Sequence, residues 1–161
     1  MENRLSSRTL GAVADFLNSS LCAGHDQAIR HLLIDSRRLS DPAKTLFFAL
    51  VGERHDGHNF ISELYERGVR AFVVSKPPTD NLPEAVFIEV DNTQAAMQNV
   101  AARWRAQFDY PVVGITGSNG KTIVKEWLFQ LLDPDRLVVR SPKSYNSQVG
   151  VPLSVWEMDI S

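Results

Sequence analysis

Cysteine is almost absent from this chain of 161 residues, in which Cys22 is the only one. A single thiol cannot form an intrachain disulfide or supply a cysteine cluster for a metal ion. The chain also lacks the Gly-x-Ser-x-Gly turn that presents a nucleophilic serine, and Cys22 stands in a polar stretch. The sequence therefore supports neither a disulfide scaffold nor a hydrolase with a serine or cysteine nucleophile.

Long hydrophobic runs and an excess of charge of one sign are missing as well. Residues 1–85 contain 10 basic and 11 acidic residues, and residues 86–161 contain 7 and 8, so no basic stripe indicates a nucleic-acid partner. No apolar run reaches membrane-spanning length, and the N-terminal stretch has no apolar core like that of a signal peptide. We expect a soluble cytoplasmic protein without membrane insertion.

The first half alternates short apolar runs with helix-like periodicity, which is typical of an α/β domain. Gly68 stands where the second expected helix should end, and the proline-rich segment 75–83 is the best candidate linker. The sequence therefore predicts a small α/β domain over residues 1–85. Its expected helices cover residues 9–17 and 59–67, and its expected strands cover residues 29–35, 46–51 and 71–75.

The second half, residues 86–161, is predicted to be the first part of a parallel-sheet ATPase domain. Strands are expected over residues 85–90, 112–115 and 137–140, with helices between them; Asp91-Asn92-Thr93 is a capping cluster for the first helix. A nucleotide-binding sheet usually has about five strands or more. Three strands leave this domain incomplete, so we expect the chain to be part of a longer enzyme.

The most informative segment is residues 112–122, which reads Val-Val-Gly-Ile-Thr-Gly-Ser-Asn-Gly-Lys-Thr. Its apolar start suits a buried parallel strand. The glycines permit backbone conformations in which several N–H groups converge on phosphate oxygens, and the helix expected from Lys121 directs its positive end to the same anion. We predict an ATP-binding loop made by Gly117, Ser118, Asn119, Gly120, Lys121 and Thr122.

Two side chains of this loop are expected to act on the phosphates. Lys121 is the candidate catalytic cation, and the Thr122 hydroxyl is the candidate Mg²⁺ ligand. The strict phosphate-loop pattern requires glycine where Ile115 stands, so the alternative is an ordinary strand-to-helix turn. The phosphate loop is favoured because a helix with one apolar stripe follows the turn. That stripe consists of Ile123, Val124, Trp127, Leu128, Leu131 and Leu132, and Asp133-Pro134 ends it.

A polar turn, Asp35-Ser36-Arg37-Arg38, follows the first apolar strand of the chain. Loops at the carboxyl ends of parallel strands often bind ligands. Arg37 can hold a phosphate or carboxylate bidentately, and Ser36 can donate to a second oxygen. An anion-binding turn and a solvated turn explain this spacing equally well.

Two other polar stretches contain side chains suited to a site. His55-Asp56-Gly57-His58 has metal-ligand side chains, but they cannot all converge without another element, so a polar loop ahead of the next helix is favoured. Asn146 lies in the stretch 144–152, close to the expected nucleotide crevice, and is a candidate contact to a phosphate, a metal-bound water or the substrate.

Three of these stretches together resemble one family, the Mur ligases, which also include the folylpolyglutamate synthetases. Residues 114–122 are similar to the family's ATP loop, including the departure at Ile115, and residues 35–37, 46–54 and 56–58 are similar to its UDP-sugar-binding domain. The resemblance covers nearly the whole chain. Within the family, the run from Lys121 to Glu126, Asn146 and residues 150–153 are most similar to members that add D-alanyl-D-alanine to a UDP-N-acetylmuramoyl-tripeptide, some of which are fused to an alanine racemase.

The resemblance implies an ATP- and Mg²⁺-dependent ligase of peptidoglycan precursor synthesis. In such a reaction ATP activates the terminal carboxylate of the UDP-linked peptide as an acyl phosphate, and the amine of D-alanyl-D-alanine displaces the phosphate. Ser36 and Arg37 would contact the UDP-sugar and Asn146 the nucleotide or substrate. The family's downstream metal ligand, carbamylated lysine and amine-binding domain would lie beyond Ser161, so we expect the chain alone not to catalyse ligation.

Two alternatives remain open from the sequence. One is a sister ligase that adds another amino acid to a shorter UDP-peptide. The other is a P-loop kinase or NTPase-type binding module in which the first domain is only regulatory. They differ in whether UDP-muramoyl peptides trigger nucleotide turnover.

Overall fold

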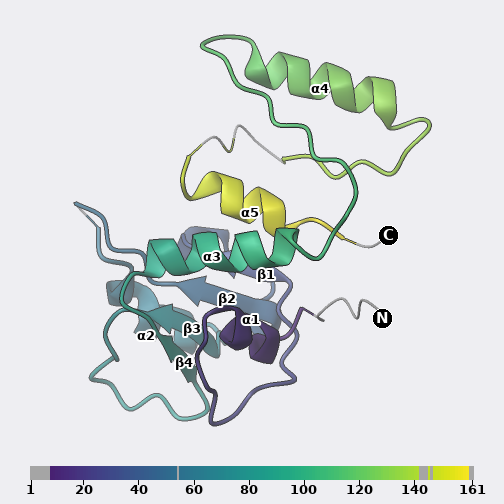
Figure 1. The fold of residues 1–161 in the computed structure, drawn as a ribbon. Coiled ribbons are helices and arrows are strands. Elements are labelled where there is room, and N and C mark those ends of the chain that lie inside the picture. The colour runs from purple at the N-terminus through teal and green to yellow at the C-terminus, as the bar shows by residue number, and fades with distance from the viewer. Residues whose placement is uncertain (1–7, 54, 142–144, 146, 160–161) are drawn as a thin grey trace.

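The computed structural model describes residues 8–53, 55–141, 145 and 147–159. Figure 1 shows a twisted sheet with helices on both faces and, above it, a segment that carries one separate helix. The described helices and strands are α1 (Leu10–Phe16), β1 (His31–Leu33), η1 (Ser36–Arg38), η2 (Pro42–Lys44), β2 (Thr45–Phe48), η3 (Gly57–Phe60), α2 (Ile61–Glu66), β3 (Ala71–Val74), β4 (Val86–Glu89), α3 (Thr93–Arg105), α4 (Lys121–Leu132) and α5 (Gly150–Trp156).

The sheet has the order β1-β2-β3-β4, and every neighbouring pair is parallel. Each strand is therefore joined to the next by a crossover, and the carboxyl ends of all four strands meet at one edge. The predicted α/β class with a parallel sheet is confirmed. No described helix has both the length and the apolar composition needed to cross a membrane.

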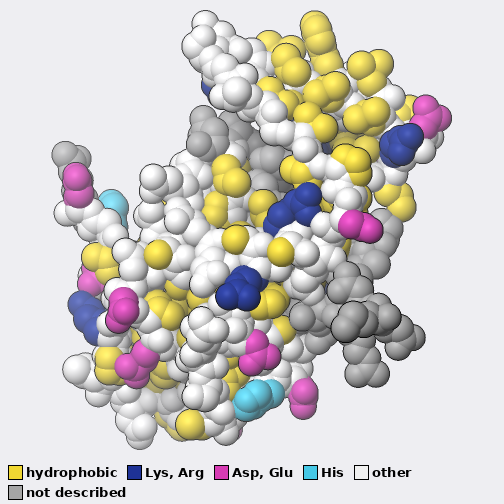
Figure 2. All heavy atoms as spheres, viewed as in Figure 1, with side chains coloured by type: hydrophobic (Ala, Val, Ile, Leu, Met, Phe, Trp, Pro, Cys, Tyr) yellow, Lys and Arg dark blue, Asp and Glu magenta, His cyan; other side chains and the backbone are white. Residues whose placement is uncertain are grey.

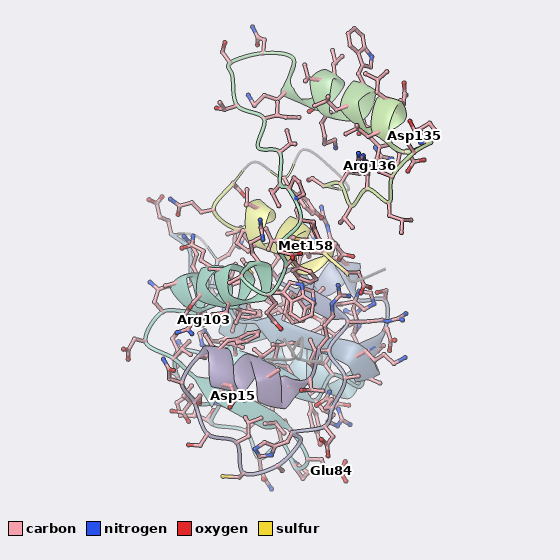
Figure 3. All side chains as sticks on the ribbon, turned by 45° about the vertical axis from the view of Figure 1, so that its right-hand side comes forward. Asp15, Glu84, Arg103, Asp135, Arg136 and Met158 are labelled. Carbon is pink, nitrogen blue, oxygen red and sulfur yellow. The ribbon has the colours of Figure 1, made fainter. Side chains whose placement is uncertain are left out.

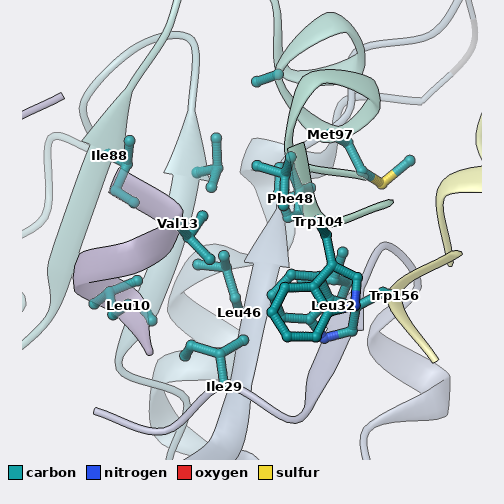
Figure 4. Close-up of a cluster of buried hydrophobic side chains, with 14 of the residues drawn as sticks. Leu10, Val13, Ile29, Leu32, Leu46, Phe48, Ile88, Met97, Trp104 and Trp156 are labelled. Carbon is teal, nitrogen blue, oxygen red and sulfur yellow. The ribbon is translucent and has the colours of Figure 1, made fainter. Parts of the chain in front are cut away.

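Side chains of β2 alternate between two hydrophobic cores, as the two-residue period of a strand requires. Leu46 and Phe48 point to the face that α1 and α3 cover, whereas Phe47 points to the face that α2 covers. Figure 4 shows the larger core, which lies on the face covered by α1 and α3: Ile88 of β4 lies near Val13 of α1, and Met97 of α3 belongs to the same cluster. Because both faces are covered, β3 (Ala71–Val74) is apolar and buried along its whole length.

Several local predictions are confirmed by the geometry. Asn92 caps α3, because its side chain accepts a hydrogen bond from the Ala95 N–H at 2.9 Å. Gly68 follows α2 with a φ of 96°, a left-handed conformation that favours glycine at the end of a helix. The buried Thr93 hydroxyl donates to the Ala49 carbonyl at 3.0 Å and so fixes the start of α3 at the end of β2.

The strand expected over residues 85–90 does not begin a second sheet. It is β4, which pairs with β3 from Ala71↔Val86 to Val74↔Glu89. Helix α3 then covers the same sheet, with Met97 and Val100 fully buried. Within residues 86–105, which the sequence pattern placed in the second half, β4 is therefore a strand of the four-stranded sheet and α3 packs on that sheet.

The strands predicted at residues 112–115 and 137–140 are wrong, since both segments lie outside any regular element. Val112 and Val113 are 57% and 68% exposed, and Leu137 is 85% exposed. A strand is stabilised by ladder hydrogen bonds to a neighbour and by packing on its faces. Among the residues that the structure describes, neither segment has a ladder partner.

Helix α4 has the predicted bounds but buries none of its residues. Figure 2 shows hydrophobic side chains gathered over it at the top of the view. Trp127 is 65% exposed and Leu131 is 73% exposed, so the apolar stripe predicted for this helix is not packed in a core of the described chain. The apolar stripe is present, but nothing in the described chain covers it.

After α4 the chain runs back toward the four-stranded sheet, where α5 packs on α3. Trp156 is buried against Trp104 with ring centroids 5.0 Å apart, and its Nε1 donates to the Arg30 carbonyl at 3.1 Å. Trp104 Nε1 in turn donates to the Met158 carbonyl at 3.1 Å. Figure 3 shows Met158 close to α5, whereas Asp135 and Arg136 follow the far end of α4. Both ends of the segment 106–149 are thus attached to the first sheet.

Candidate functional site

The predicted ATP-binding loop lies at the N-terminus of α4. Gly117 and Gly120 have φ values of 142° and 77°, which side-chain-bearing residues rarely adopt. Gly120 is the N-cap of α4 and forms no side-chain cap hydrogen bond. A helix N-terminus without a side-chain cap leaves its first N–H groups and its positive dipole end available to an anion. The backbone of this loop therefore fits a phosphate ligand.

Lys121, the predicted catalytic cation, folds back over the loop. Its ammonium donates to the Gly117 carbonyl and lies 3.5 Å from the Ser118 carbonyl. The positive charge is therefore held above the turn that the two glycines form. Ser118 and Asn119 lie in the same exposed turn, and Thr122 follows Lys121 in the first turn of α4. The structure thus keeps all six predicted loop residues together.

The second candidate site is the turn after β1. The Asp35 carboxylate accepts from Arg37 Nε and Nη2, both at 2.8 Å, and also from the Arg37 backbone N–H at 3.1 Å. The side-chain hydrogen bond from Arg37 is the largest cause that lowers the pKa of Asp35, to about 2. Arg37 itself is 86% exposed. Its charge points to solvent but is already paired.

Ser36, the other predicted substrate contact, is buried and begins the short helix η1. Its carbonyl accepts from Arg67 Nη1 at 2.8 Å, and the same nitrogen donates to Glu63 at 2.9 Å. This ties the turn to the end of α2. Ser36 and Arg37 therefore lie on a turn that Arg67 holds from the end of α2.

Asn146, the third predicted substrate contact, lies outside the described residues. Its neighbour Tyr145 is described and contacts the turn after β1: Arg38 Nη1 donates to the Tyr145 hydroxyl at 3.1 Å. Arg38 and Tyr145 line a cavity of about 140 Å³, together with His31, Asp35 and Leu153. Tyr145 thus lies next to the turn after β1.

A set of hydrogen bonds joins α4 to α5, the helix that lines the same cavity with Leu153. Lys125 Nζ on α4 donates to the Ser141 carbonyl at 2.8 Å, and Ser154 Oγ on α5 donates to Ser141 Oγ at 3.0 Å. Glu126 accepts from Lys125 and Arg140, with the Lys125 contact at 3.0 Å. The hydrogen bond from Lys125 is the largest cause that lowers the pKa of Glu126. Through Ser141, the ATP-loop helix is linked to α5.

The stretch His55-Asp56-Gly57-His58 forms a loop that is fixed by its own side chains. Asp56 Oδ1 accepts from the His58 N–H at 2.9 Å and contacts His58 Nδ1 at 2.5 Å, and Asp56 Oδ2 accepts from Lys76 at 3.0 Å. His58 Nε2 accepts from the Ser75 N–H at 3.1 Å. The network therefore joins the start of η3 to the end of β3. Within the described residues no group of three or more His, Cys, Asp or Glu side chains is arranged to hold a metal ion.

Sequence reasoning missed Arg38, Tyr145 and the link through Ser141. Arg38 follows Arg37 and Tyr145 precedes Asn146 in the sequence, and no local pattern marks either residue as a contact. Their contact spans 107 positions in the sequence. Only a prediction of how α5 packs on the first sheet could have found it.

Comparison with known proteins shows which family this chain resembles. The profile of the Mur ligase family, catalytic domain, matches residues 28–105. A UDP-N-acetylmuramoyl-tripeptide–D-alanyl-D-alanine ligase of Synechocystis sp. is 36% identical over 159 residues, which cover 95% of this chain and 34% of that protein. The corresponding ligase of Escherichia coli is 35% identical over 92% of this chain and 32% of its own length.

Solved structures lead to the same family. A crystal structure of MurF from Acinetobacter baumannii matches 96% of this chain and 34% of its own, with a TM-score of 0.82 and 28% identity. MurF ligase from Thermotoga maritima in complex with ADP matches 81% of this chain and 30% of its own, with a TM-score of 0.66 and 31% identity. The chain spans about a third of the length of these relatives. It belongs to the Mur ligase family.

Proposed function

We propose that this chain provides the ATP-binding loop and the UDP-sugar-binding unit of a ligase that joins D-alanyl-D-alanine to a UDP-N-acetylmuramoyl-tripeptide in peptidoglycan precursor synthesis. The observation that carries the proposal is the similarity to ligases of that name over more than nine tenths of the chain, loop included. ATP and sugar nucleotides are cytoplasmic metabolites, so we propose a cytoplasmic location.

Nucleotide binding is assigned to the loop at the start of α4. The positive φ values of Gly117 and Gly120 and the N-terminus of α4 suit a polyphosphate. Lys121 is proposed to exchange its loop carbonyl contacts for phosphate oxygens and to neutralise charge on the transferred phosphoryl group. ATP supplies the phosphoryl group that activates a substrate carboxylate. The relative crystallised with ADP supports this assignment.

Thr122 is proposed as the Mg²⁺ ligand of this chain. A hydroxyl oxygen is a suitable donor for Mg²⁺, which proteins usually bind through few side chains together with substrate phosphates. The described residues offer no acidic cluster at the loop. The donor set therefore fits a Mg²⁺ ion that arrives with the nucleotide rather than one that the chain holds alone.

Ser36, Arg37 and Asn146 are proposed as contacts to the sugar nucleotide. The exposed guanidinium of Arg37 stands at the carboxyl end of β1, where parallel sheets place their ligands. Ser36 forms the buried base of the same turn. Phosphate binding by Arg37 requires that a ligand oxygen replace or join the Asp35 carboxylate.

We propose that the substrate unit extends to about residue 110 and that the ATP-binding domain starts there. The pairing of β4 with β3 and the packing of α3 support this boundary over one at residue 85. The exposed apolar stripe of α4 and the unpaired segments 112–115 and 137–140 suit a parallel sheet with further strands. For this reason we expect no ligation by the 161-residue chain alone.

A binding experiment tests the nucleotide assignment on this chain. Isothermal titration with ADP and Mg²⁺ should give saturable binding that Lys121→Ala weakens at least tenfold, because the substitution removes the cation above the loop. Lys44→Ala is the matched control, since Lys44 lies in η2 and pairs with Asp41. Equal affinities for the chain and the Lys121→Ala variant would contradict the assignment.

An activity experiment separates the proposed function from its two alternatives. Phosphate release from ATP is measured on the longest form that the gene encodes, with UDP-N-acetylmuramoyl-tripeptide and D-alanyl-D-alanine supplied together or singly. The proposed ligase requires both. Turnover with a shorter UDP-peptide and a single amino acid instead identifies a sister ligase, and turnover indifferent to UDP-peptides identifies an NTPase-type module.

A further inference from the structure

Tyr145 lies between the two candidate sites, and neither site assigns it a role. It follows the ATP-loop segment in the chain, yet its hydroxyl accepts from Arg38 Nη1 at 3.1 Å in the turn after β1. Arg38 Nε also lies 3.9 Å from the Asp35 carboxylate that binds Arg37. The Tyr145 hydroxyl is therefore one hydrogen bond away from the turn that carries Ser36 and Arg37.

The position of Tyr145 is set by the start of α5. A Cβ atom on Gly150 would lie 2.9 Å from both the Cα and the Cβ of Tyr145, so glycine is needed for this close approach. The Gly150 N–H donates to Ser147 Oγ at 2.9 Å, and this hydrogen bond fixes the bend between Ser147 and Gly150. Tyr145 is thus held by the backbone of α5 and not only by its own side chain.

Helix α5 is in turn anchored at several points on the first sheet. Trp156 is 1% exposed and donates to the Arg30 carbonyl, immediately before β1. Gln148 is bound by two side chains of α3, Gln94 at 2.7 Å and Gln98 at 3.2 Å. These contacts attach α5 and the residues before it to α3 and to the start of β1, and so place Tyr145 beside Arg38.

The same helix receives the contact from α4. Ser154 of α5 donates to Ser141, whose carbonyl accepts from Lys125 of α4. A continuous set of hydrogen bonds and packed backbone therefore runs from the ATP-loop helix through Ser141 and α5 to Tyr145 and Arg38. Coupling between two sites requires such an element whose arrangement both sites influence.

We propose that Tyr145 is a positioning residue: its hydroxyl holds the 35–38 turn in place, and α5 makes that hold respond to nucleotide at the 117–122 loop. The first part stands on the contacts of this chain alone, and the second part rests on the proposed function. Tyr145 touches neither nucleotide nor substrate in this role. It acts through Arg38.

Hydrogen exchange of the whole chain, followed residue by residue, tests the first part without ligand. The Arg38 N–H donates to the Asp35 carbonyl at 2.9 Å and the Leu39 N–H to the Ser36 carbonyl at 3.4 Å, so both amides report opening of the turn. Tyr145→Phe should speed exchange of these two amides about fivefold, the effect of losing one ordinary hydrogen bond. Tyr110→Phe, which removes a hydroxyl contact to the Asp159 carbonyl instead, should leave them unchanged.

A double-mutant comparison assigns the effect to the pair. Arg38→Met should speed the same exchange, and adding Tyr145→Phe to Arg38→Met should change it no further. Unchanged exchange in Tyr145→Phe, or additive effects of the two substitutions, would overturn the positioning role. Tyr145→Phe retains the aromatic ring, so we expect the fold to be kept. A general loss of folding would also speed exchange in β2 and β3, which distinguishes it from a local opening of the turn.

The second part is tested by adding ADP and Mg²⁺. Exchange should slow at the loop amides 117–122 and also at Arg38 and Leu39, and the slowing at Arg38 and Leu39 should be absent in Tyr145→Phe. Protection of the loop without any effect at Arg38 overturns the coupling while the proposed function stands. Absence of loop protection contradicts nucleotide binding by this chain and with it the coupling, and the ligand-free comparison still decides the positioning role.

Discussion

Arg37 and Asp35 form a bidentate pair within a single turn, with Nε and Nη2 each 2.8 Å from a carboxylate oxygen. The pair explains why an 86% exposed guanidinium keeps a defined direction, since its planar fork matches the carboxylate. It also means that the Arg37 guanidinium is already paired with a carboxylate before any phosphate binds. A sugar nucleotide that binds here must displace the Asp35 carboxylate or share the guanidinium with it.

The pair predicts a specific titration. Because the side-chain hydrogen bond from Arg37 is the largest cause that lowers the pKa of Asp35 to about 2, Arg37→Gln should move that pKa back toward 3.8. NMR of the Asp35 carboxyl carbon, followed from about pH 1.5 to about pH 6, measures this pKa directly. Arg103→Gln on the exposed side of α3 is the control. An Asp35 pKa that stays near 2 in Arg37→Gln would mean that another group stabilises the carboxylate.

Asp56 predicts a pH-dependent stability. Burial acts to raise its pKa, but the His58 N–H, the Lys76 ammonium and the His58 side chain outweigh burial, so the pKa is lowered to about 2. A carboxylate with a lowered folded-state pKa stabilises the fold above its unfolded-state pKa of about 3.9, and this stabilisation is lost as the pH falls toward 2. Asp56→Asn should therefore cost about 1 kcal/mol near pH 6 and almost nothing near pH 2.

Urea unfolding at several pH values measures this difference. The free energy of unfolding of the chain and of Asp56→Asn should converge between about pH 4 and pH 2. Asp109→Asn, an exposed position after α3, serves as the control. A difference that stays constant over the same range would show that Asp56 acts through shape and not through its charge.

Gly57 and Gly52 offer a matched pair for a steric prediction. A Cβ atom at Gly57 would lie 2.7 Å from the Leu50 nitrogen and 2.8 Å from the Ala49 backbone, whereas at Gly52 the nearest atom would be 3.7 Å away. Gly57→Ala must push backbone against backbone at the end of β2, which should destabilise the chain by about 1–3 kcal/mol. Gly52→Ala should be nearly neutral in the same unfolding experiment. Equal stability of the two variants would show that the loop moves aside freely.

The sequence carried enough information to predict the elements of the first sheet, because each one is encoded locally. The alternating apolar residues around Leu46 and the cap at Asn92 act within one element, whatever lies beside it. The helix that begins at Lys121 was predicted for the same reason. Its apolar stripe and the Asp133-Pro134 end are local signals, and α4 does end at Leu132.

Predictions failed where the outcome depends on a partner. Val112 and Val113 suit a strand, but their pattern does not say which strand they would pair with, and the described chain offers none. A strand was predicted correctly at β4 (Val86–Glu89), but its pairing with β3 was not, because the residues of β4 do not identify the partner strand. The Arg38–Tyr145 contact of the candidate site has the same character, because it depends on how α5 packs.

Trp156 and Trp127 show the same division between local pattern and packing, and they predict opposite effects of one substitution. Trp156 is 1% exposed, packs on Trp104 and donates to the Arg30 carbonyl, whereas Trp127 is 65% exposed on α4. Trp156→Ala leaves a cavity and removes the donor to the Arg30 carbonyl, so it should cost about 3–5 kcal/mol of unfolding free energy. Trp127→Ala should change it by less than about 0.5 kcal/mol.

Urea unfolding followed by far-ultraviolet circular dichroism measures both effects. If Trp156→Ala does not fold, Trp156→Phe keeps most of the packing and loses only the indole N–H, with an expected cost of about 1–2 kcal/mol. Trp127→Ala should also leave the remaining tryptophan fluorescence blue-shifted, because Trp104 and Trp156 are both buried. A loss of several kcal/mol in Trp127→Ala would mean that the apolar face of α4 is covered in solution, by a second copy of the chain or by a rearrangement of the 106–149 segment. Repeating the measurement over a range of protein concentrations distinguishes these two, since only association makes the midpoint depend on concentration.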